Sequence, residues 1–161
     1  MDRMAEVRVF DLMTREVEAV SPDTTITAFC RLAAAGGFTS APVLDDDGRL
    51  VGIVSRTDVV RAMIQGGADD SSDDYEDIVE LLSSRFVEFD ERKHPRRFTY
   101  VEEIMATDVV TTAPEASALD AARLMSSNRI HRLPVLRDGR LVGIISSFDL
   151  MRYFAGEQPP V

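Results

Sequence analysis

The chain has 161 residues, of which 45% are hydrophobic, and a formal net charge of −10 at pH 7. This length suits one medium-sized domain or two very small ones, and the charge argues against binding to nucleic acid or anionic lipid. The single cysteine, Cys30, excludes an intrachain disulfide framework, and no stretch approaches the roughly 18 apolar residues of a membrane span.

Residues 7–64 predict a strand, a helix, two further strands and a closing helix, in that order. The run VEAVSP (17–22) predicts a short strand that ends at proline. Four apolar residues then recur at helical spacing: Ile26, Phe29, Cys30 and Ala33. This helix is expected to stop at Gly36 and Gly37. APVL, an Asp-Gly turn and RLVGIV predict a β-hairpin, and DVVRAMI begins the closing helix.

Residues 65–98 have a different composition, acidic at first and basic at the end. Four residues at helical spacing predict an amphipathic helix flanked by flexible polar stretches: Tyr75, Ile78, Leu81 and Leu82. The aspartate run lacks the glycine and glutamate spacing of an EF-hand loop. We therefore interpret it as a solvated surface rather than a metal site.

Residues 99–156 repeat the first pattern. The offset is 92 up to Pro42 and Pro134, and 91 afterwards, because DDDG has one residue more than RDG. VVTTAP (109–114) predicts the first strand. The helix pattern and its capping box recur at Ser117, Ala118, Asp120, Ala121, Ala122 and Met125. A unit of about 55 residues buries too little surface to be stable alone, so the two repeats are expected to share one core.

Both repeats carry Ser-x-x-Asp where a strand passes into a helix: Ser55 with Asp58, and Ser146 with Asp149. One interpretation is a helix cap, with the serine oxygen on a free N–H and the carboxylate near the positive end of the helix. The other is a ribonucleotide site. A helix N-terminus attracts phosphate, and a carboxylate accepts both hydroxyl protons of a ribose diol. The residues alone leave both interpretations open.

The ordered pattern MT…V…SPDTTI…APVLDDDGRLVGIVSRTDVV and its partner IMATDVVTTAPEAS…NRIHRLPVLRDGRLVGIISSFDLM resembles a tandem pair of CBS domains, the Bateman module. The resemblance covers nearly the whole chain apart from 65–98 and the termini. It implies an α+β fold of two β-α-β-β-α repeats, at 7–64 and 99–156, related by a pseudo-twofold axis. It also implies regulatory binding of AMP, ADP or ATP, sometimes of S-adenosylmethionine, in the cleft between the repeats.

The resemblance also implies which residues contact the ligand. In such modules the last aspartate of the motif holds the ribose, the serine faces phosphate, and the backbone of the first strand frames the adenine. The corresponding residues in the two repeats are, in that order, Asp58 and Asp149, Ser55 and Ser146, and Val17 and Val109.

The segment NRIHRLPV is similar to the phosphate-contacting stretch in the gamma subunit of AMP-activated protein kinase, which places His131 and Arg132 at the phosphates. The alternative is that both are solvated residues at a strand edge. The first repeat has Thr39 and Ser40 at these places, and Arg56 is the candidate to supply charge there. The two sites are therefore expected to be unequal.

The sequence gives little support to an enzyme. Cys30 lies among apolar helix positions, the two histidines, His94 and His131, show no zinc-site spacing, and the glycines form no phosphate-binding loop. We predict a cytoplasmic, non-enzymatic nucleotide sensor without metal or cofactor that acts on a partner protein. The competing hypotheses are a protein-interaction module without nucleotide, and a nucleic-acid-binding module using RKHPRR (92–97), against which the charge argues.

The expected assembly is a homodimer without membrane contact. Its helices offer more apolar surface than a monomer of this size readily covers, and proteins of the resembling family commonly bury such faces against a second copy. The residues expected to face outward are Met63, Ile64, Met151 and Phe154.

Overall fold

The computed structural model describes residues 6–65 and 99–157, except for the side chains at 64 and 65. These residues form two compact units. Unit one contains 6–17, 48–50 and 109–157, and unit two contains 18–47, 51–65 and 99–108. The amphipathic helix predicted around Tyr75 and the RKHPRR segment lie outside the described residues, as does the side chain of Ile64.

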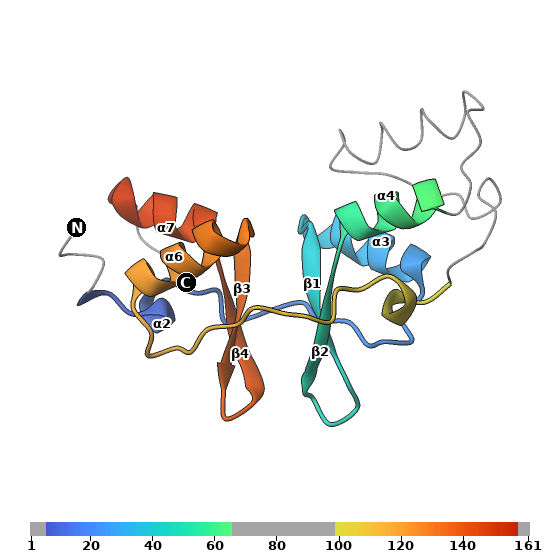
Figure 1. Cartoon of the computed structure of the whole chain (residues 1–161), viewed down its shortest axis with the longest axis horizontal. Coiled ribbons are helices and arrows are strands. Elements are labelled where there is room, and N and C mark those ends of the chain that lie inside the picture. The colour runs from blue at the N-terminus through green and yellow to red at the C-terminus, as the bar shows by residue number, and fades with distance from the viewer. Residues whose placement is uncertain (1–5, 66–98, 158–161) are drawn as a thin grey trace. The chain divides into compact units, whose positions relative to one another are not determined.

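Each unit contains an antiparallel β-hairpin and two longer helices (Figure 1). The elements of unit one are α2 (Val9–Leu12), α6 (Ala118–Asn128), β3 (Arg132–Arg137), β4 (Arg140–Ser146) and α7 (Ser147–Phe154). The elements centred on unit two are α3 (Ile26–Gly36), β1 (Ser40–Leu44), β2 (Leu50–Ser55), α4 (Arg56–Gln65) and the 3-10 helix η1 (Val101–Glu103). The helices and hairpins predicted within the described residues are confirmed. None of the described helices is long and apolar enough to cross a bilayer.

The helix ends follow from local sequence signals. α3 stops where Gly37 takes φ +66°, a left-handed conformation that favours glycine. α6 begins at Ser117, whose side chain accepts a hydrogen bond from the Asp120 N–H at 3.0 Å. The β3–β4 turn has positive φ at both Asp138 and Gly139, as a type I′ turn requires.

Residues 6–17 precede helix α3 of the first repeat, but they pack against the second repeat. Arg8 forms an antiparallel bridge with Ser117, at the N-terminal end of α6. The Val7 carbonyl accepts a hydrogen bond from the Ala118 N–H at 2.8 Å. Residues 6–17 therefore belong structurally to the repeat that lies about ninety positions later in the chain.

Residues 99–108, the leading segment of the second repeat, pack against the first repeat in unit two. Tyr100 forms an antiparallel bridge with Thr25, and the Thr99 carbonyl accepts from the Ile26 N–H at 3.0 Å. These residues occupy the positions equivalent to Arg8, Ser117, Val7 and Ala118. The two repeats have therefore exchanged their leading segments in a matched way.

The exchange explains why the predicted first strands, 17–22 and 109–114, are not formed as strands. Four isolated bridges flank the hairpins: Val20 with Val43, Ala106 with Ile53, Thr112 with Val135, and Thr14 with Ile144. Thr14 pairs in unit one, whereas Val20 pairs in unit two. A segment that passes from one unit to the other within six residues does not stay paired along one hairpin.

The described residues contain two clusters of buried side chains, one in each unit, and each cluster includes side chains of both repeats. Phe29 and Val54 lie in the cluster of unit two, and Leu133 and Ile145 in that of unit one. The exchanged segments complete both clusters. Val9, Leu12 and Met13 enter the core of unit one, and Val101 enters that of unit two. Each small repeat thus gains buried apolar area from the other.

The prediction that Met63 faces outward is also wrong. Met63 is half-buried and packs against the core of unit two. It lies one helical turn after Val59, which is 1% exposed, and so shares its buried face. Met151 and Phe154 of α7 are exposed, as predicted.

Cys30 is buried in the core of unit two, as predicted, and burial raises the pKa of its thiol from 9.0 to about 11. Folding therefore favours the neutral thiol, and the stability it contributes is lost as pH rises from about 9 to about 11. At pH 8 we expect a thiol reagent to modify the folded chain at least about 100-fold more slowly than the urea-unfolded chain. Equal rates would show that Cys30 is not in a core.

Candidate functional site

In unit one, Ser146 and Asp149 form a capping box at the start of α7. Asp149 Oδ2 accepts from the Ser146 N–H at 2.7 Å and from the Ser146 hydroxyl at 2.6 Å, and the Asp149 N–H donates to Ser146 Oγ at 3.3 Å. Asp149 is half-buried. Among the residues that the structure describes, no hydrogen bond is made to Asp149 Oδ1, whereas Oδ2 accepts two.

Ser55 and Asp58 have the same arrangement in unit two. Asp58 Oδ2 accepts from the Ser55 N–H at 2.8 Å and from its hydroxyl at 2.6 Å. Here, however, Arg61 Nη1 donates to Asp58 Oδ1 at 3.1 Å. The capping interpretation is confirmed in both repeats, and the outer carboxylate oxygen differs between them.

His131 and Arg132 lie beside the capping box of unit one. Arg132 is the register partner of Ser146 across the β3–β4 hairpin, and the His131 carbonyl accepts from the Ser147 N–H at 2.9 Å. His131 is exposed and Arg132 is half-buried. The structure therefore brings the backbone of His131 and Arg132 next to the Ser146–Asp149 capping box, at one end of the hairpin.

The equivalent end of unit two lacks the imidazole. The Thr39 carbonyl accepts from the Arg56 N–H at 3.1 Å, and Arg56 is half-buried in the first turn of α4. Val17 and Val109, predicted beside the adenine, are both half-buried in the segments where the chain passes between units. Their role in binding stays a prediction.

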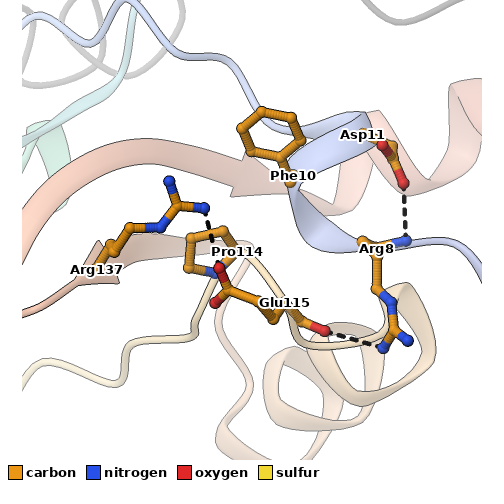
Figure 2. A pocket seen from close by; sticks show the side chains of 6 residues that line it. All are labelled: Arg8, Phe10, Asp11, Pro114, Glu115 and Arg137. Carbon is orange, nitrogen blue, oxygen red and sulfur yellow. Dashed lines mark hydrogen bonds and ion pairs between the residues drawn. The ribbon is translucent and has the colours of Figure 1, made fainter.

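A different group of charged residues surrounds a pocket of about 440 Å³ in unit one (Figure 2). Its lining residues are Arg8, Phe10, Asp11, Pro114, Glu115 and Arg137. Arg137 Nη2 donates to Glu115 Oε1 at 2.9 Å, and Arg8 Nη1 donates to the Glu115 carbonyl at 3.0 Å. The pKa of Glu115 is lowered by the hydrogen bond from its own backbone N–H and by Arg137. These contacts link residues 6–17 to the second repeat. We assign no ligand to this pocket.

The sequence analysis predicted neither the ion pair between Arg61 and Asp58 nor the hydrogen bonds that Arg8 and Arg137 donate to Glu115. Arg61 was visible as the arginine three positions after the motif aspartate, which recurs as Arg152. Arg8, Glu115 and Arg137 are single charged residues far apart in the chain and carry no pattern. Among the described residues no group of three or more His, Cys, Asp or Glu side chains is placed to hold a metal ion.

Comparison with known proteins then decides the family. The CBS-domain model matches twice, at residues 9–65 and 101–156. The chain belongs to the CBS-domain family. Its two matches confirm the tandem pair, and its helices and small antiparallel hairpins agree with the α+β fold of such pairs.

Relatives and solved structures agree with this assignment. Uncharacterized protein MJ1426 of Methanocaldococcus jannaschii is 33% identical over 147 residues, covering 88% of this chain and 87% of the relative. The structure of CBSX2 in complex with AMP has a TM-score of 0.70 at 26% identity, covering 93% of this chain and 97% of that one. The CBS-domain pair of protein MJ0100 has a TM-score of 0.71 at 23% identity, with coverages of 93% and 97%.

Several other relatives are longer than this chain. It spans 43%, 33% and 41% of the length of three further relatives from Methanocaldococcus jannaschii, the uncharacterized proteins MJ0188, MJ1404 and MJ1232.

Proposed function

We propose that this CBS pair is a regulatory module that binds an adenine nucleotide at the Ser146–Asp149 site of unit one. The observation that carries the proposal is the state of the Asp149 carboxylate. Its Oδ2 is fixed by Ser146, which orients the group, while Oδ1 has no partner among the described residues. A fixed carboxylate oxygen with free lone pairs suits a ribose diol. The AMP complex of CBSX2, 26% identical to this chain, supports the choice of ligand.

The neighbouring residues fit the rest of a nucleotide. Arg132 lies opposite Ser146 in the hairpin register and supplies a charge for phosphate, with His131 next to it. Val17 and Val109 are the proposed backbone frame of the adenine. In unit two, Ser55, Asp58 and Arg56 form the second, weaker site.

The decisive experiment is isothermal titration of the nucleotide-stripped chain with AMP, ADP, ATP, adenosine, S-adenosylmethionine and NADH. We expect an adenine nucleotide to bind, and Arg132→Ala to weaken ATP binding more than adenosine binding. Binding of S-adenosylmethionine alone would reassign the ligand. No binding by any of the six would favour the competing function, a protein-interaction module, for which the intact capping boxes already give both Ser-Asp pairs a structural role.

We further propose that nucleotide binding is read by a partner protein in the cytoplasm and is not coupled to catalysis by this chain. The Ser146 hydroxyl donates to Asp149 Oδ2 as part of a helix cap, and the two CBS-domain matches, at 9–65 and 101–156, account for most of the chain.

We also propose that the chain is a homodimer that uses the exposed apolar side of α7. Phe148, Met151 and Phe154 are 61%, 57% and 69% exposed and follow one another at successive turns. Light scattering at micromolar concentration should give twice the monomer mass of 17.8 kDa.

The double variant Phe148→Ser with Met151→Ser should shift this mass toward the monomer value. Leu32→Ser, which changes an exposed apolar residue of α3, is the matched control and should leave the dimer intact. A wild-type mass near 17.8 kDa would contradict the dimer.

A further inference from the structure

We propose that Arg61 competes with ligand for Asp58 and so weakens the site of unit two, whereas Glu157 holds the equivalent Arg152 away from Asp149 and keeps the site of unit one open. This inference rests on the proposed nucleotide function. It assigns the inequality of the two sites to residues that lie one turn beyond the Ser-x-x-Asp motif.

The two capping boxes are nearly identical, so they do not explain an inequality. In both, the aspartate Oδ2 accepts two hydrogen bonds from the serine, with N–H···O distances of 2.8 and 2.7 Å and O–H···O distances of 2.6 Å. A carboxylate oxygen has about two lone-pair sites. Oδ2 is therefore fully used, and a hydroxyl ligand depends on Oδ1.

The two Oδ1 atoms have different surroundings. Asp58 Oδ1 accepts from Arg61 Nη1 at 3.1 Å, an ion pair within one turn of α4. The side chain of Asp58 is only 12% exposed, while that of Arg61 is 60% exposed. A ribose diol that donates two protons to this oxygen must displace the guanidinium. At Asp149, no described residue has to be displaced.

Arg152 occupies the place of Arg61 in the second repeat but pairs elsewhere. Its Nε donates to Glu157 Oε2 at 3.1 Å. Gly156 takes φ +77° after α7, and the Glu157 N–H donates to the Arg152 carbonyl at 3.0 Å. This closure, of the Schellman type, folds the chain back and brings the glutamate to the arginine.

The first repeat has no counterpart of this glutamate. The residue at the position of Glu157 is Gly66, which has no side chain to hold an arginine. Among the described residues, Arg61 pairs with Asp58. We assign the difference between the two aspartates to this position, where the second repeat has a glutamate that pairs with Arg152 and the first repeat has a glycine.

The test separates the sites by removing one aspartate at a time and titrating the full chain with AMP. In an Asp149→Ala background, only the site of unit two remains, and Arg61→Ala should tighten AMP binding about two- to fivefold, the value of an exposed ion pair. The gain should disappear with 2′,3′-dideoxy-AMP, because that probe has no hydroxyl for Asp58.

The converse variants use an Asp58→Ala background. There Glu157→Gln should weaken AMP binding by a similar factor, because Arg152 is released toward Asp149. Arg152→Ala alone should leave the affinity unchanged, and combining it with Glu157→Gln should restore the affinity of the background. Circular dichroism of each variant checks that α7 still forms.

Each outcome bears on one proposal or both. If Arg61→Ala leaves AMP affinity unchanged or weakens it, the competition is overturned, although AMP binding itself stands. If Glu157→Gln has no effect, the protection of Asp149 is overturned. If the wild-type chain binds none of the titrated nucleotides, the proposed function and this inference fall together.

Discussion

Asp149→Ala is expected to weaken AMP binding about 10- to 100-fold, because hydrogen bonds to a charged group typically contribute about 1.5–3 kcal/mol. The lost group is the carboxylate whose Oδ1 is open and whose Oδ2 is fixed by Ser146. Asp58→Ala should cost less, since Arg61 already engages the equivalent oxygen. Isothermal titration of both variants with AMP measures the difference.

The control for this prediction is stability. Losing the cap on α7 costs about 1 kcal/mol of unfolding free energy, whichever function the site has. Ser146→Ala removes the hydroxyl from the same cap and should produce a similar loss of stability, which urea unfolding measures. If Asp149→Ala lowers stability by this amount and leaves AMP affinity intact, the capping box is only structural. Equal losses of affinity at Asp58 and Asp149 would contradict the proposed inequality.

The sequence predicted those features that depend on neighbouring residues. The helical spacing of Ile26, Phe29 and Cys30, the stop at Gly37 and the Asp-Gly turn at 138–139 all report local backbone preferences, and the structure has each of them. The capping boxes belong to the same class, because the serine and aspartate are three residues apart.

No local sequence pattern indicated that the two repeats exchange their leading segments. Val9 is 0% exposed against the second repeat, but a repeat pattern presents nearly the same helix and hairpin in both copies. The spacing of apolar residues predicts that one face of a segment is buried. It does not predict which of the two similar repeats covers that face. Similarly, the arginine that follows each motif is visible in the sequence. Its partner depends on the backbone turn at Gly156.

Alanine substitutions at Gly143 and Gly52 test whether the leading segments are exchanged, because each glycine contacts one of these segments. An alanine Cβ at Gly143 would lie 2.6 Å from Met13 Sδ and 2.9 Å from the Thr14 carbonyl oxygen. At Gly52, the equivalent Cβ would lie 2.5 Å from Met105 Sδ. Gly143→Ala should therefore lower the free energy of unfolding by about 1–3 kcal/mol, the usual cost of overpacking a core. Urea unfolding followed by circular dichroism measures it.

The methionines then show which leading segment covers which hairpin. Met13→Val shortens the side chain that meets Gly143, so it should recover part of the loss caused by Gly143→Ala, a coupling that a double-mutant cycle detects. Met105→Val is the matched control: it should add independently to Gly143→Ala and couple instead to Gly52→Ala, because Met105 lies against Gly52. Coupling of Gly143 to Met105, with none to Met13, would mean that each repeat keeps its own leading segment. In that case the fastening of Arg8 to Glu115 would not exist in solution.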